Sequence, residues 1–320
     1  MAADSAADLG RRLRGGDLSA APAVLNVVEN RSPAGREDVA ALLREVAPAA
    51  LGAEAPGHVI GVTGPPGAGK SSLLSRLVGA WRDLGRSVAV LAVDPSSRRS
   101  GGALLGDRAR IEHDPADRAV FIRSTAAGDR VGGLAPATRS AAQALSAAFD
   151  VVVIETVGVG QSETEVADVA DTVAVVVQPG SGDVLQFLKA GIMEIPDVLV
   201  VTKADMGVVA QRARRDLAAA LRSLGSQAPV VAVSSVSPAT GVEDLVAALD
   251  AHRAALDLGR RRLRARRRCA LADFAAEHGE RGLRALGGRR AAERWLEGQD
   301  PGADVPRLAH ALAERALEAS

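Results

Sequence analysis

One short stretch between an apolar run and a helical pattern constrains this chain more than any other. Residues 64–71 read Gly-Pro-Pro-Gly-Ala-Gly-Lys-Ser, which matches the pattern G-x-x-x-x-G-K-[ST]. The glycines let the backbone curl so that successive N–H groups point at one spot, beside the positive end of the following helix. Because such a nest of amides binds anions, the pattern predicts a phosphate-binding loop.

The stretches on either side of the loop support this interpretation over a glycine-rich turn without a ligand. Residues 59–63 form an apolar run typical of a buried strand, and residues 72–84 place apolar side chains at helical spacing. Lys70 is predicted to reach the β- and γ-phosphates of a nucleotide, and the Ser71 hydroxyl to bind Mg²⁺. The residues predicted to contact the nucleotide are Gly64, Pro65, Pro66, Gly67, Ala68, Gly69, Lys70, Ser71 and Ser72.

Two further apolar runs end in an acidic residue. The first ends at Asp94 and the second, residues 151–155, ends at Glu155. In open α/β sheets, ligands bind at the carboxyl ends of the strands, so both carboxylates are candidate Mg²⁺ ligands. Glu155 is expected to hold the ion through water. Asp107, after a loop rich in Ser and Gly, is a third candidate, with capping of the next helix as its alternative role.

The residues after Glu155 bear on hydrolysis. Gly158 is placed to sense a γ-phosphate through its amide. Val159 follows it, at a position where small GTPases often carry a glutamine that positions the attacking water. Because valine cannot orient water, intrinsic hydrolysis is expected to be slow. Gln161 is the nearby candidate for that role.

A second motif predicts which base is bound. The strand-like run 198–201 is followed by Thr202-Lys203-Ala204-Asp205, a match to [NT]-K-x-D. The Asp205 carboxylate can accept from guanine N1–H and the exocyclic amine, a donor pair that adenine lacks. The Lys203 stem would stack on the base. Thr202 stands where Asn is commoner, so one contact is expected to be weaker. The backbone of Ser234, Ser235 and Val236, after the last strand-like run, is expected to touch the guanine oxygen.

The basic residues are almost all arginines. Lys70, Lys189 and Lys203 are the three lysines of the chain, and two of them lie in nucleotide motifs, so Lys189 becomes a catalytic candidate. The arginine-rich run 260–268 could contact an anionic surface, but it has no aromatic residue to stack on a base. The polar side of a helix is the favoured interpretation.

Composition excludes several classes of protein. The net charge is zero, so nothing global indicates a nucleic-acid or membrane partner. Cys269 is the single cysteine, which excludes an internal disulfide and a multi-cysteine metal site. No apolar run reaches the ~18 residues that a membrane span needs. The N-terminus carries several aspartates and resembles no targeting signal, so we expect a cytoplasmic protein.

These patterns predict an α/β phosphate-loop NTPase with a mostly parallel sheet flanked by helices. The expected organisation is an N-terminal helical extension (residues 1–52), a GTPase domain (53–258) and a C-terminal helical arm (259–320) that serves in dimerisation. The arm is too small to bury its apolar residues alone, so they are expected to pack on the main domain or on a second copy.

Four long motifs together resemble the MeaB/ArgK family of GTPases, to which the methylmalonic aciduria type A protein is related. They are residues 64–71, residues 94–97 with 100–108, residues 155–163, and residues 179–191. The resemblance spans about residues 18–258, whereas the tail matches only in length and helical character.

The resemblance implies a homodimeric G-protein chaperone of an adenosylcobalamin-dependent acyl-CoA mutase of the methylmalonyl-CoA mutase type. Such a chaperone binds the mutase, gates cofactor delivery by the cobalamin adenosyltransferase and helps to clear inactivated cofactor. Its GTP hydrolysis is slow alone and stimulated by the mutase. Residues 94–108, 155–163 and 178–189 would be three switches, with Lys189 coupling hydrolysis to the mutase.

Two other functions fit parts of the sequence. A metal-delivery GTPase would share the phosphate loop, but the five histidines are scattered and there is one cysteine. An ATP-dependent kinase linked to amino-acid transport is the older description of this family. Asp205 in the base motif argues against ATP as its substrate.

Overall fold

The computed structural model describes residues 4–30, 32–94, 111–126, 134–156, 162–180 and 196–319. The chain divides into two compact units. One contains residues 1–57, 139–148 and 257–320, and the other contains residues 58–138 and 149–256. The three-part organisation expected from the sequence stays a prediction.

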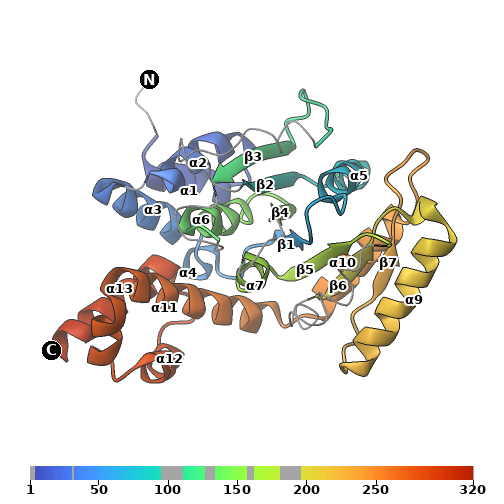
Figure 1. Cartoon of the computed structure of the whole chain (residues 1–320). Helices are drawn as coiled ribbons and strands as arrows, with labels where there is room; N and C mark the ends of the chain where they lie inside the picture. The colour runs from blue at the N-terminus through green and yellow to red at the C-terminus, as the bar shows by residue number, and fades with distance from the viewer. Residues whose placement is uncertain are drawn as a thin grey trace, which may run out of the picture. The chain divides into compact units, whose positions relative to one another are not determined.

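The second unit is built on a parallel sheet whose strand order is β3-β2-β4-β1-β5-β6-β7 among the described residues (Figure 1). Every pairing between neighbours is parallel. The predicted α/β class is therefore confirmed. The strands are β1 (His58–Thr63), β2 (Val88–Asp94), β3 (Val120–Ala126), β4 (Val151–Glu155), β5 (Thr172–Val177), β6 (Val198–Val201) and β7 (Val230–Ala232).

The central strands are valine-rich because helices cover both of their faces. β1, β4, β5 and β6 are buried along their whole length. Such strands appear in a sequence as continuous apolar runs rather than as an alternation, which is why these runs were recognisable. The bounds of β6 agree with the predicted run 198–201.

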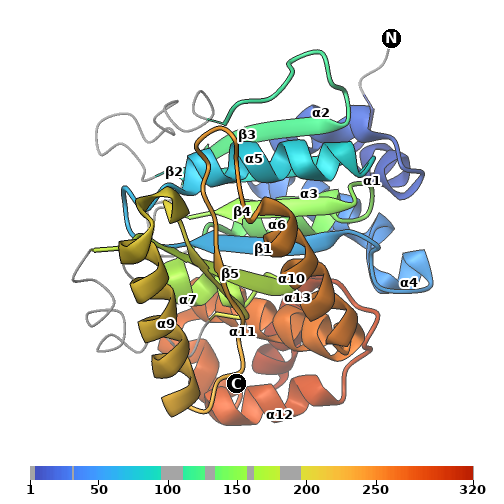
Figure 2. The same ribbon diagram turned by 90° about the vertical axis from the view of Figure 1, so that its right-hand side faces the viewer.

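Helices α5 (Lys70–Asp83) and α10 (Val242–Ala255) cover one face of this sheet (Figure 2). Their leucines and valines join Ile60 and Val62 in one buried cluster. Helix α7 (Ser162–Ala167) lies on the opposite face, because the side-chain positions of a strand alternate and Gly61 faces it. A Cβ on Gly61 would lie 2.6 Å from a methyl group of Val166. Helix α9 (Val208–Ser223) lies beside β7 (Figure 1).

The first unit is helical in its described residues. Its C-terminal helices bury most of their apolar residues in a hydrophobic cluster of their own, and the expected packing of the tail on the main domain or on a second copy stays a prediction. Leu317 is the exception, with 78% of its surface exposed. The helices are α1 (Ala6–Arg14), α2 (Ala21–Glu29), α3 (Pro33–Glu45), α4 (Pro48–Leu51), α6 (Pro136–Leu145, shared with the second unit), α11 (Leu258–Ala285), α12 (Arg289–Glu297) and α13 (Val305–Glu318).

The arginine-rich run 260–268 lies in α11, and two of its members are buried. Arg262 donates to the carbonyls of Ala55 and Gly57 at 2.7 and 2.6 Å. Arg266 makes a bidentate pair with Glu54, with both distances 2.9 Å. These arginines hold the segment before β1, a structural role. Within the described ranges, no helix is both long and apolar enough to span a membrane.

Candidate nucleotide site

The loop between β1 and α5 has the backbone conformation that its glycines allow. The φ angles of Gly64, Gly67 and Gly69 are 146°, 76° and 88°, all in the region that side chains disfavour. A Cβ on Gly64 would lie 2.0 Å from the carbonyl oxygen of Val176 in β5. Position 64 therefore requires glycine for two reasons: the end of β1 comes close to β5, and the φ angle is positive.

Lys70 is the first residue of α5 and is buried. Its ammonium donates to the carbonyl of Gly64 at 2.7 Å and to that of Pro65 at 3.2 Å. The cation therefore lies over the loop at the positive end of the helix. A phosphate there would offer it a stronger, charge-assisted partner than a neutral carbonyl.

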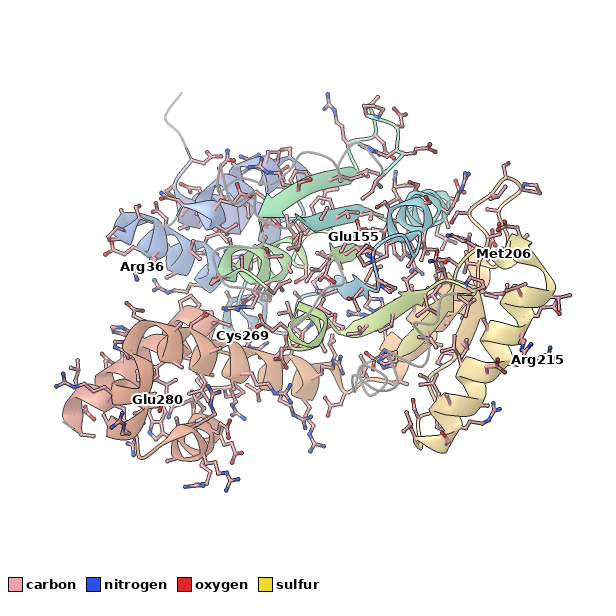
Figure 3. The ribbon with its side chains drawn as sticks, in the orientation of Figure 1. Arg36, Glu155, Met206, Arg215, Cys269 and Glu280 are labelled. Carbon is pink, nitrogen blue, oxygen red and sulfur yellow. The ribbon has the colours of Figure 1, made fainter. Side chains whose placement is uncertain are left out.

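The two residues predicted to bind Mg²⁺ from neighbouring elements meet. The Ser71 hydroxyl donates to Oε1 of Glu155 at 3.2 Å. Glu155, which is labelled in Figure 3, ends β4. This strand pairs with β1 so that Glu155 lies opposite Val62. The ends of these two strands are also joined by Thr156, whose hydroxyl donates to that of Thr63 at 2.8 Å. The sheet order thus brings the carboxylate to the loop.

A hydroxyl and a buried carboxylate are the oxygen ligands that Mg²⁺ prefers, so Ser71 and Glu155 fit the ion. Asp94 ends β2, which pairs with β4, and so it lies at the same edge of the sheet. Within the described residues, no cluster of three His, Cys, Asp or Glu side chains could hold a metal by itself. Phosphate oxygens and water would complete the coordination, as is usual for Mg²⁺.

Several predicted residues lie outside the described part of the chain. They are Asp107, Gly158, Gln161 and Lys189. Their roles in metal binding, γ-phosphate sensing, water orientation and coupling stay predictions.

Thr202 links the base motif to the phosphate loop. Its hydroxyl donates to the carbonyl of Ala68 at 2.6 Å, and the carbonyl of Val177 lies 3.1 Å away. The side chain is buried, and it also stands beside Gly69. Threonine at this position therefore ties together the segments that would hold the phosphates and the base.

The next contacts concern Asp205 and Lys203 of the base motif and the turn that follows β7. Asp205 Oδ1 accepts from the Ser234 hydroxyl at 2.8 Å, and this serine is buried. Lys203 has a positive φ of 54° and donates to the side chain of Gln178. Ser234 also exchanges two backbone hydrogen bonds with Thr240, which closes the turn that carries Ser235 and Val236.

Sequence reasoning missed two contributions to this turn. It assigned Ser234 a backbone contact only, whereas the side chain orients Asp205. It did not identify Arg76 of α5, whose Nε donates to the carbonyl of Ser235 at 2.9 Å. A serine directly after the last strand could have indicated the first role. No local pattern indicates the second, because the partners are far apart in the sequence.

Comparisons with known proteins agree with this geometry. A family profile described as "Methylmalonyl Co-A mutase-associated GTPase MeaB" matches residues 21–280. A Pyrococcus abyssi protein with a provisional GTPase name is 42% identical over 258 residues, which cover 78% of this chain and 76% of that protein. The mouse mitochondrial methylmalonic aciduria type A homolog is 39% identical over 174 residues, 53% of this chain and 42% of that protein.

A solved structure shows the same fold. The crystal structure of a protein named LAO/AO transport system kinase has a TM-score of 0.66 and 28% sequence identity, and the match covers 93% of this chain and 98% of that one. Together with the phosphate loop and base motif, these matches establish the lineage of the chain. It belongs to the MeaB family of methylmalonyl-CoA mutase-associated GTPases.

Proposed function

We propose that this GTPase binds Mg²⁺–GTP in the site described above and acts as a chaperone of an adenosylcobalamin-dependent acyl-CoA mutase. The observation that carries the nucleotide part is the 2.6 Å hydrogen bond from Thr202 to Ala68. It fixes the base motif against the phosphate loop, so that one nucleotide can span both. The association with methylmalonyl-CoA mutase in the family's description supports the mutase part.

Each phosphate-binding group has a distinct role in this proposal. The loop amides and Lys70 hold the β- and γ-phosphates, and Ser71 and Glu155 hold Mg²⁺ with Asp94 and Asp107 as further candidates. When bound, the ion neutralises charge on the phosphate oxygens. Gln161 orients the attacking water, and Lys189 couples hydrolysis to the mutase.

GTP is preferred because Asp205 is oriented for guanine. The hydroxyl of Ser234 occupies one side of the carboxylate and leaves it as an acceptor for N1–H and the exocyclic amine. Adenine offers no such pair of donors, so it would form neither of these hydrogen bonds to Asp205. The kinase function in the name of the solved relative is therefore not the one proposed for this chain.

The proposed assembly is a cytoplasmic homodimer that binds the mutase and the cobalamin adenosyltransferase. Binding of GTP or GDP would select which of them it engages, because a γ-phosphate orders switch segments that GDP leaves free. Gating of cofactor loading and protection or reactivation of the mutase would follow from that selection.

Calorimetry with purified protein and Mg²⁺ tests the nucleotide part. GTP and GDP are expected to bind and ATP to bind at least about a hundredfold more weakly, because adenine forgoes two hydrogen bonds to Asp205, each worth about tenfold. Asp205→Asn should shift the preference from GTP to XTP, whose C2 carbonyl suits the amide. No binding of any guanine nucleotide would refute the proposal.

Turnover measurements test the mutase part. GTP hydrolysis is expected to be slow alone and to rise when purified methylmalonyl-CoA mutase is added. An equal amount of a cobalamin-independent acyl-CoA enzyme is the control. Unchanged turnover, together with separate elution of the two proteins in gel filtration with GTP and with GDP, would exclude this partner.

A further inference from the structure

Arg76 joins the phosphate-binding helix to the turn that follows β7. It lies on the same helix as Lys70, and its Nε donates to the carbonyl of Ser235 at 2.9 Å. The arginine side chain is half-buried, and the turn lies at the surface, where Val236 is 61% exposed. The bond therefore fixes a surface turn and contributes little to the buried core.

The peptide between Ser235 and Val236 is held from both sides. Arg76 binds its carbonyl, and its N–H, on Val236, donates to the Ser234 hydroxyl at 3.3 Å. The same hydroxyl donates to Asp205 at 2.8 Å. Because a peptide unit is planar, these contacts together set the orientation of the whole turn.

One amide of this turn remains available. The N–H of Ser235 makes no hydrogen bond to the described part of the chain, although the groups on either side of it do. It belongs to the turn that also orients the Asp205 carboxylate. A guanine whose N1–H and amine meet Asp205 carries its C6 carbonyl on the adjacent edge, where an N–H donor is needed.

We propose that Arg76 is a positioning residue for guanine recognition, a role that rests on the proposed nucleotide site. It holds the turn so that the Ser235 N–H meets the C6 oxygen of the base, and it does not touch the nucleotide itself. Adenine has an amino group at C6, so the same N–H would face a donor and reject it. The arginine thus extends base selection from Asp205 to a second atom of guanine.

Calorimetry with GTP and 6-thio-GTP tests this role, because the two nucleotides differ only at the C6 acceptor and sulfur is the weaker one. Arg76→Met is expected to weaken GTP binding about tenfold, the worth of one hydrogen bond. Binding of 6-thio-GTP should change by less than about twofold, since it gains little from that bond. Arg76→Lys, which keeps one donor, should recover part of the loss.

Arg82→Met is the matched control, since it removes an arginine from the same helix whose partner is Asp117. It should leave the ratio of the two affinities unchanged. Equal weakening of both nucleotides in Arg76→Met, or no weakening of either, would overturn the proposal. If Arg76→Met does not fold, Arg76→Gln gives the same comparison. If the wild-type protein binds neither nucleotide, the nucleotide site itself is refuted, which is a separate outcome.

Discussion

The two edges of the parallel sheet use the same residue types for different purposes. At the amino edge, three aspartates each stand directly before a strand and accept the N–H of a residue at the start of the neighbouring strand. Asp150 accepts from Ser87 at 2.8 Å, Asp171 from Val59 at 2.9 Å and Asp197 from Val173 at 2.9 Å. These carboxylates satisfy backbone donors that the ladder leaves over at strand ends.

At the carboxyl edge, polar side chains contact loops and one another. Lys70 lies over the carbonyls of its own loop, Ser71 meets Glu155, and Thr202 binds Ala68. The contacts at this edge can exchange for those of a ligand, because phosphates and Mg²⁺ offer stronger partners. Position on the sheet therefore separates the two kinds of carboxylate: the amino-edge acids hold strands together, and the carboxyl-edge acids are the ones proposed to serve the nucleotide.

The amino edge also holds a relay of two histidines. The Thr172 hydroxyl lies 2.7 Å from Nε2 of His58 and 2.8 Å from Nδ1 of His252. His252 Nε2 lies 3.2 Å from Asp197. The relay thus joins β1, β5 and α10.

The largest expected effect comes from breaking the amino edge at Asp171. This fully buried carboxylate accepts from Val59 and also from Arg253 at 2.9 Å. Asp171→Ala should lower the free energy of unfolding by about 3–5 kcal/mol, because it removes the buried partner of the Arg253 guanidinium. Urea denaturation followed by circular dichroism measures this loss.

Asp171→Asn is the control, since it keeps an acceptor of similar shape and should cost less. The folded fraction of either variant should still bind GTP with the wild-type affinity. A loss below about 1 kcal/mol for the alanine variant would contradict the structural role given to this edge.

A substitution at Glu155 should impair hydrolysis and leave stability nearly unchanged, the reverse of the effect expected at Asp171. Glu155→Gln keeps the shape of the side chain but removes the charge beside Ser71. Hydrolysis of GTP should fall by roughly a hundredfold, the usual size for losing one electrostatic contribution to a transition state. The free energy of unfolding without nucleotide should change by less than about 1 kcal/mol. Single-turnover phosphate release and urea titration measure the two quantities.

The comparison fails if Glu155→Gln destabilises the protein as much as Asp171→Ala does. In that case the carboxyl-edge acid would be as structural as the amino-edge ones. Restoration of hydrolysis by higher Mg²⁺ concentration would support a role in holding the ion.

Thr202 lies at the carboxyl edge, but its hydrogen bond joins two segments of the protein, as the bonds of the amino edge do. It therefore tests whether such a bond at the carboxyl edge also affects nucleotide binding. Thr202→Val keeps the shape and removes the donor to Ala68. GTP affinity should fall by about tenfold, the equivalent of one hydrogen bond. Calorimetry measures it, and Thr202→Ser, which keeps the hydroxyl, should bind GTP nearly as well as the wild type. Equal affinities for the valine variant and the wild type would remove Thr202 from the site.

The fold and the phosphate loop were predictable because their signals are local. Strand runs such as residues 198–201 and the loop at residues 64–71 are recognised within a few neighbouring residues. Helix α9 was missed, since its buried positions are sparse among arginines: Ala210, Leu217 and Leu221 are its buried residues. A helix with so narrow an apolar stripe gives a weak periodic signal.

The pairings between distant residues were not predictable. Asp171 and Asp197 precede apolar runs and look like ordinary strand boundaries in the sequence. Their partners follow from the sheet order, which a single sequence does not fix. The same holds for Arg76, whose contact with Ser235 depends on how α5 lies against the turn after β7. The motifs were therefore enough to predict the residues of the site, whereas the contacts that support those residues depend on the sheet order.

The smallest expected effect concerns a fourth aspartate at the amino edge, and it is visible in the pH dependence of stability. Asp117 precedes β3, and the hydrogen bond from Arg82, with a further one from the N–H of Ala119, holds the pKa of this carboxyl below its ordinary value of 3.8. A carboxyl with a lowered pKa in the folded state stabilises the protein above its unfolded pKa. That contribution is lost as the pH falls through the lowered pKa.

Asp117→Asn should therefore make unfolding less sensitive to acid below about pH 4, while leaving the slope above about pH 5 unchanged. The effect should be small because the carboxyl is partly exposed, and solvent screens such pairs. Thermal melts between about pH 2 and pH 6 measure it against the wild type. An unchanged acid limb would mean that Asp117 contributes only its backbone contact.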